Sequence, residues 1–117
     1  RSDNDVSQSY HYNERGWTYF LLKEYDNAID DSDKAVKLDP QNHYAWDTRG
    51  NGYLAKGMYD KAIADFTKAL EIYPDDPEYY KNRGNAYTKK KECKKAMADF
   101  KKACEMGDKD ACNQKCS

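Results

Sequence analysis

The sequence predicts an all-α fold, a solenoid of three antiparallel helix hairpins with a short closing helix. The main observation is an internal period of 34 residues, which is typical of stacked helical units. A second is the short break in the middle of each repeat, near residue 23, at Gly57 and near residue 91. A third is composition, because 35% charged residues make a single spherical core thin, whereas 11 tyrosines suit an elongated one.

Taken in order, the helices of the three repeats are expected at about 9–22 and 25–38, 43–56 and 59–72, and 77–90 and 92–106. Pro40 and Pro74 end the first two repeats because proline cannot continue a helix, whereas Pro77 suits a first turn. Gly107 stands where a left-handed helix stop is expected. The resulting segments are a polar extension at 1–8, repeats at 9–42, 43–76 and 77–108, and a capping helix and tail at 109–117.

The N-terminal extension is polar and is expected to be frayed, with Ser7 or Ser9 capping the first helix. Gly16, Gly50 and Gly84 lie mid-helix, where glycine costs about 1 kcal/mol relative to alanine, so their recurrence indicates a steric need. Phenylalanine fills the facing position in the second and third repeats. Ser32 replaces it in the first, so looser packing is expected there.

Charge is distributed unevenly along the chain. The net charge is −1, and it divides into −7 for residues 1–80, +7 for 81–102 and −1 for 103–117. The bulk value gives no reason to expect a nucleic-acid or membrane partner, and the apolar runs are too short to span a bilayer. The basic third repeat is either a solvated lysine face or a surface that attracts an acidic partner.

Signals for catalysis are weak. His11 and His43 stand alone near helix starts, and the chain contains no phosphate-binding loop or dinucleotide motif. We therefore expect a non-catalytic protein that uses no cofactor and no metal.

The repeats closely resemble the tetratricopeptide repeat (TPR) family. In the second repeat the family pattern is carried by Trp46, Gly50, Tyr53, Ala62, Phe66, Ala69 and Pro74. The first repeat matches at Tyr12, Gly16, Tyr19, Ala28, Ala35 and Pro40, and the third at Tyr80, Gly84, Tyr87, Ala96, Phe100 and Ala103. The resemblance covers about residues 9–108 and implies a right-handed α-α superhelix that binds proteins.

The resemblance also implies a concave groove lined by the first helix of each hairpin. The main groove residues are then Tyr10, Asn13, Trp17, Phe20, Tyr44, Asp47, Asn51, Lys81, Asn82 and Asn85. Trp17 is either a binding hot spot or is covered by the N-terminal residues. The asparagines are able to hydrogen-bond a peptide backbone.

One known family function is a clamp for the C-terminal carboxylate of chaperones, which needs lysines, an arginine and asparagines. The matching positions here hold Asn13, Trp17, Thr48, Glu78 and Asn82, so the sequence argues against that clamp.

An arginine before each central glycine has an aspartate sixteen residues later. We predict pairs across each hairpin or between hairpins, namely Arg15–Asp31, Arg49–Asp65 and Arg83–Asp99. The alternative is an arginine ladder that binds acidic ligands.

Four cysteines lie in the last 25 residues, and an even, clustered count favours disulfides in an oxidising compartment. By resemblance to cysteine-rich solenoids, Cys104 is expected to pair with Cys112. A second pair, Cys93 with Cys116, requires the tail to leave helical form and stretch back. A zinc site and reduced thiols are the alternatives. The cysteines favour a periplasmic or secreted location over the cytoplasm.

Two functions remain open at this point. The first is a scaffold that binds a peptide or partner helix in its groove. The second is a structural segment that stacks on itself or within a larger array. The protein is expected to be a monomer or a weak homo-oligomer.

Overall fold

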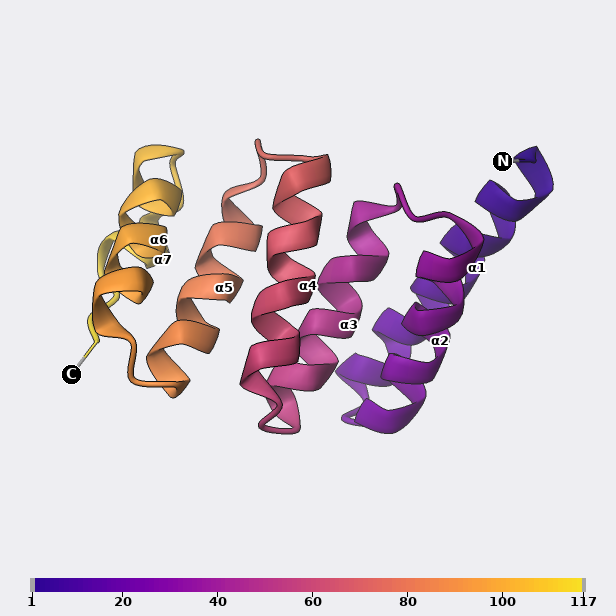
Figure 1. Ribbon diagram of the computed structural model, residues 1–117, viewed down its shortest axis with the longest axis horizontal. Coiled ribbons are helices and arrows are strands. Elements are labelled where there is room, and N and C mark those ends of the chain that lie inside the picture. Colours follow the sequence, from indigo (N-terminus) through magenta and orange to yellow (C-terminus); the bar gives the residue numbers. More distant parts are fainter. Residues whose placement is uncertain (1, 117) are drawn as a thin grey trace.

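The computed structural model describes residues 2–116, so residue 1 of the predicted extension and residue 117 of the predicted tail lie outside it. The described residues form seven α-helices and no strand (Figure 1). Their bounds are α1 Asp3–Leu21, α2 Tyr25–Leu38, α3 His43–Ala55, α4 Tyr59–Ile72, α5 Pro77–Lys89, α6 Cys93–Glu105 and α7 Lys109–Cys112. Among these residues, no helix is both long enough and apolar enough to cross a bilayer.

The helices form three antiparallel hairpins that stack along the longest axis of a molecule measuring 43 × 26 × 20 Å (Figure 1). Within the hairpins α1 packs on α2, α3 on α4 and α5 on α6, and between them α2 packs on α3 and α4 on α5. The first helices also contact each other, α1 with α3 and α3 with α5, so they line the inner side of the arc. The predicted all-α solenoid is confirmed.

All three hairpin turns use the same backbone geometry. One residue in each turn has a positive φ, 63° at Lys23, 80° at Gly57 and 65° at Lys91. In each case the next amide donates back into the first helix, as Glu24 N–H does to the Tyr19 carbonyl oxygen at 2.9 Å. Only Gly57 takes this conformation without steric cost, so the sequence marks the second turn most clearly.

The first helix starts earlier than the sequence predicted. It begins at Asp3, and Ser2, not Ser7 or Ser9, caps it by accepting a hydrogen bond from the Asp5 amide at 3.0 Å. Ser9 is buried, donates to the Ala35 carbonyl oxygen at 2.7 Å and accepts from Asn42 at 2.9 Å. The described part of the polar extension is therefore helical, because a cap and two first-turn acidic residues favour it.

The central glycines allow two different kinds of close packing. A Cβ added at Gly50 would lie 2.7 Å from the ring of Phe66, and Gly84 has the same relation to Phe100. At Gly16 the facing atoms belong to α2 near its backbone, with the Ala28 carbonyl oxygen and the Asp31 Cβ both at 3.3 Å and the Ser32 nitrogen at 3.4 Å. The expectation of looser packing at Ser32 is wrong, since Ser32 is fully buried and the backbone of α2 closes onto α1.

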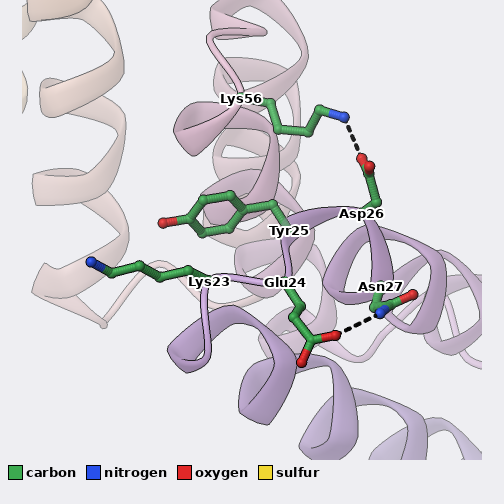
Figure 2. A pocket seen from close by; sticks show the side chains of 6 residues that line it. All are labelled: Lys23, Glu24, Tyr25, Asp26, Asn27 and Lys56. Atoms are coloured by element: carbon green, nitrogen blue, oxygen red, sulfur yellow. Dashed lines mark hydrogen bonds and ion pairs between the residues drawn. The ribbon is translucent and has the colours of Figure 1, made fainter.

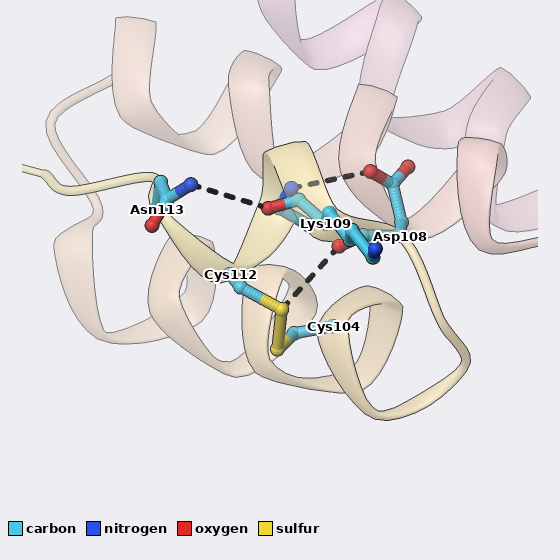
Figure 3. Close-up of a disulfide and its surroundings, with 6 residues drawn as sticks. Cys104, Asp108, Lys109, Cys112 and Asn113 are labelled. Carbon is cyan, nitrogen blue, oxygen red and sulfur yellow. Dashed lines mark hydrogen bonds between the residues drawn. A yellow bond between two sulfur atoms is a disulfide. The ribbon is translucent and has the colours of Figure 1, made fainter.

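Two disulfides close the C-terminal end. Cys104 is bonded to Cys112, with Cα atoms 4.7 Å apart, and Cys93 to Cys116, with Cα atoms 5.3 Å apart. Figure 3 shows the first bridge joining α6 to the short α7. All four sulfur atoms are used, so neither a zinc site nor reduced thiols describes this structure.

The short helix α7 is attached both by this bridge and by packing. Ala111 is buried against Ala96, Phe100 and Ala103 of α6. Replacing Cys104 and Cys112 with serine should lower the free energy of unfolding by about 2–3 kcal/mol, because the loop that they close is no longer constrained in the unfolded chain. Urea unfolding followed by circular dichroism measures the loss. An unchanged midpoint would show that packing alone holds α7.

Candidate functional site

The three arginine–aspartate pairs lie within the hairpins and are built alike. Nε of Arg15, Arg49 and Arg83 donates to the aspartate sixteen residues later at 2.7, 2.9 and 2.8 Å, and Nη2 donates to the second carboxylate oxygen. Each guanidinium also lies within 5.0–6.0 Å of the centroids of two aromatic rings, such as Trp46 and Tyr53 for Arg49. A planar guanidinium suits both contacts, whereas lysine does not.

The inner arginines also join successive hairpins. Nη1 of Arg49 donates to Asp33 at 2.8 Å, and Nη1 of Arg83 donates to Thr67 at 3.1 Å. The side chains of Arg49 and Arg83 are 16% and 19% exposed, against 57% for Arg15. Arg49 and Arg83 therefore act as structural links between hairpins. Of the three arginines proposed as a ladder for acidic ligands, only Arg15 is largely exposed.

The concave face exposes aromatic side chains at its N-terminal half. Trp17 is 39% exposed and stacks on Phe20, with ring centroids 5.1 Å apart. Tyr44 on α3 is 50% exposed and lies beside Tyr10 of α1, with centroids 6.3 Å apart. Residues 3–8 continue along the axis of α1, so the alternative that the N-terminal residues cover Trp17 is wrong.

Asp47 is the polar centre of the groove. Its carboxylate accepts hydrogen bonds from Asn82 of α5 at 2.9 Å and from Asn51 at 3.3 Å. Burial raises the pKa of the Asp47 carboxyl to about 7; the hydrogen bond from Asn82 lowers it, and the charges of Glu78 and Asp76 raise it. Two of the four predicted groove asparagines therefore position the Asp47 carboxyl.

This arrangement makes stability depend on pH. The native Asp47 carboxyl keeps its proton up to about pH 7, whereas the unfolded one loses it near pH ~4. The native state binds more protons between these values, so its stability falls as the pH rises through them. Asp47→Asn should raise the free energy of unfolding by about 1–2 kcal/mol at pH 8 and leave it unchanged below pH ~4. Urea titrations at both pH values test this, and equal effects at both would contradict it.

The remaining predicted groove residues lie in the C-terminal half. Lys81 forms ion pairs with Glu78 at 3.3 Å and with Asp108 at 3.4 Å. Asn85 is half-buried on α5. The charge of Lys81 is therefore largely neutralised by its neighbours, and the aromatic half of the groove is the more distinctive part.

Sequence reasoning missed an aromatic cluster around His43. The His43 ring stacks on Tyr73 with centroids 4.7 Å apart, and its Nδ1 shares a 2.7 Å hydrogen bond with the Tyr79 hydroxyl. Burial lowers the pKa of His43 and raises that of Tyr79. These residues do not recur at the 34-residue period, so the repeat pattern contained no signal for them.

A hollow of about 350 Å³ at the end of the first hairpin is a feature of the repeat (Figure 2). Lys23, Tyr25 and Asn27 are among its lining residues, and Lys56 forms an ion pair with Asp26 across it. The next hairpin has the same hollow, crossed by Lys90 and Asp60 at 2.6 Å. The hollow therefore recurs with the turn between the two helices of a hairpin.

Stacked hairpins with a concave inner face define an α-helical solenoid. Tetratricopeptide repeat models match residues 9–42 and 77–110, and a TPR repeat model matches residues 50–91. The chain is a tetratricopeptide repeat protein. A search of curated proteins found no match.

Solved structures agree on the fold. The TPR domain of Arabidopsis OM64 has a TM-score of 0.87 at 27% identity, over 92% of this chain and 90% of that one. The Sgt2 TPR domain from Aspergillus fumigatus has a TM-score of 0.82 at 27% identity, over 88% and 70%. The first TPR of Spaghetti (RPAP3), bound to the HSP90 peptide SRMEEVD, has a TM-score of 0.88 at 24% identity, over 92% and 87%.

Proposed function

We propose that the protein is a non-catalytic interaction scaffold that binds a peptide or a partner helix in the concave groove of α1, α3 and α5. The TPR fold is typically a non-catalytic scaffold, and the Spaghetti domain of the same fold holds a peptide. The first helices are free on their inner side, whereas their outer sides are packed against the second helices.

The exposed pair Trp17 and Tyr44 carries this proposal. Large aromatic side chains are costly to leave in water, and tryptophan and tyrosine are enriched at binding hot spots. Both belong to the groove and line one cavity between α1 and α3. Their rings are also held in place, Trp17 by Phe20 and Tyr44 by Tyr10, so little order has to be gained on binding.

Peptide display followed by titration tests the proposal. Peptides selected from a random library against the folded protein should bind Trp17→Ala at least 30-fold more weakly, because a hot-spot truncation costs about 2 kcal/mol or more. Met97→Ala on α6 is the matched control, since Met97 is 40% exposed and lies on a second helix. Selected peptides that lose affinity for Met97→Ala and keep it for Trp17→Ala would refute groove binding.

The alternative function, stacking on itself or within a larger array, is less well supported. One position, equivalent in the three repeats, packs against the preceding hairpin. It holds the buried Ala45 and Tyr79 in the second and third repeats, and the exposed His11 in the first. A polar outer face suits a repeat that ends an array. Light scattering decides between the two, since a concentration-dependent rise in mass would favour stacking.

We further propose a periplasmic or secreted location, with the cytoplasm as the alternative. The support is the pair of disulfides, because such bonds persist mainly in oxidising compartments. Alkylation of free thiols in the protein taken from its native cells tests this. Labelling of all four cysteines would contradict it.

A further inference from the structure

The aromatic half of the groove contains a defined cavity. It has a volume of about 240 Å³ and lies between α1 and α3. Its lining residues are Asn13, Glu14, Trp17, Tyr44, Asp47 and Thr48. The cavity therefore combines two exposed aromatic rings with two carboxylates.

The two carboxylates are not neutralised by the protein itself. Within residues 2–116, no lysine or arginine forms an ion pair with Glu14 or Asp47. The predicted groove lysine, Lys81, lies on α5 and is already paired with Glu78 and Asp108. The negative charge of Glu14 thus remains available to a ligand, whereas the Asp47 carboxyl, with a pKa of about 7, is charged only above that pH.

The cavity contains a hydrogen-bond acceptor that has no donor in the described part of the protein. Oδ1 of Asn13 is buried and has no hydrogen-bond partner among the described residues, which is unfavourable for a polar atom removed from water. The Thr48 hydroxyl already donates to the Tyr44 carbonyl oxygen at 3.0 Å. The amides of Asn51 and Asn82 donate hydrogen bonds to the Asp47 carboxyl and bring no charge of their own. The groups left open are therefore acceptors and aromatic faces.

We propose that this cavity takes the lysine or arginine side chain of a bound peptide. The inference rests on the proposed groove function and names the chemistry of its partner. A cation over the face of an aromatic ring is attracted by the ring's quadrupole, and a hydrogen bond to a carboxylate strengthens its binding further. The preference is opposite to that expected for the acidic HSP90 peptide SRMEEVD of the Spaghetti complex.

The test uses the displayed peptides described above. Selected sequences should be enriched in lysine or arginine, and replacing that residue with norleucine or citrulline, which are uncharged, should weaken binding at least tenfold in 50 mM salt. Binding should also weaken as salt rises to 300 mM, because exposed charges are screened. An arginine-to-lysine exchange in the peptide then shows whether the guanidinium fork or the charge alone is recognised.

Matched variants of the protein locate the charge. Glu14→Gln should weaken the basic peptide at least threefold, whereas Glu71→Gln, which changes an exposed glutamate on α4, should not. Thermal melts check that both variants fold as the wild type does. Peptides that bind the groove equally well with the charge removed would overturn this inference and leave groove binding intact. A library that yields no groove-binding peptide would overturn both.

Discussion

Replacing Arg49 with methionine should lower the free energy of unfolding by about 3–5 kcal/mol, which is the effect expected when one member of a buried ion pair is removed. The Asp65 carboxylate is only 5% exposed and would lose both hydrogen bonds from Arg49. Burial already raises the pKa of Asp65, and Arg49 opposes that shift. Without Arg49 the native carboxyl would hold its proton to higher pH than the unfolded one, so the loss should be larger at pH 8 than at pH 5.

Arg15→Met is the matched control for this change. Its guanidinium is 57% exposed and links no second hairpin, so water can reach Asp31 once it is gone, and the loss should be clearly smaller. The double change Arg49→Met with Asp65→Leu should recover most of the stability, because no buried charge is left unpaired. Urea unfolding of all three variants measures this. Equal losses for Arg49→Met and Arg15→Met would show that the inter-hairpin link contributes nothing.

Replacing Phe66 with alanine should cost about 3–5 kcal/mol, as expected for removing a fully buried aromatic ring. The ring lies against Gly50, which explains why glycine is needed there. Gly50→Ala alone should therefore destabilise the protein, since its Cβ would lie 2.7 Å from the Phe66 ring.

A double-mutant cycle separates this steric effect from helix propensity. In the Phe66→Ala background Gly50→Ala should become neutral or stabilising, because alanine favours the helix by about 1 kcal/mol and partly fills the cavity. Chemical denaturation of the four proteins gives the coupling energy. Additive losses would contradict the proposed steric role of the glycine.

Much of the fold could be predicted because the period, the glycines and the prolines act locally and recur three times. The pairing of Arg49 with Asp65 could be predicted for the same reason, because an arginine and an aspartate sixteen residues apart occur in every repeat. The start of α1 could not be found this way, because Ser2 and Asp3 lie before the repeating pattern. The looser packing expected at Ser32 was wrong because the backbone shift that compensates for a missing ring is not encoded in any single residue.

The groove was placed by resemblance, and its chemistry depended on contacts between repeats. The resemblance placed Asp47 among the groove residues but gave no indication of its burial or of its hydrogen-bond partners. Its importance comes from Asn82, which lies on the next hairpin, and from the burial that this neighbour completes. The spacing of residues within one repeat does not predict a contact between two repeats. The same applies to His43 and Tyr79, which lie on adjacent hairpins and share a hydrogen bond.

The position of the disulfides has a mechanical consequence. Both lie between Cys93 and Cys116, so the covalent restraint ends at α6. In a solenoid each unit feels mainly its neighbours, and rigidity conferred at one end fades towards the other. The hairpin that carries Trp17 lies farthest from the restraint. We therefore expect the covalent restraint to be greatest in the C-terminal hairpin and least in the hairpin that carries Trp17.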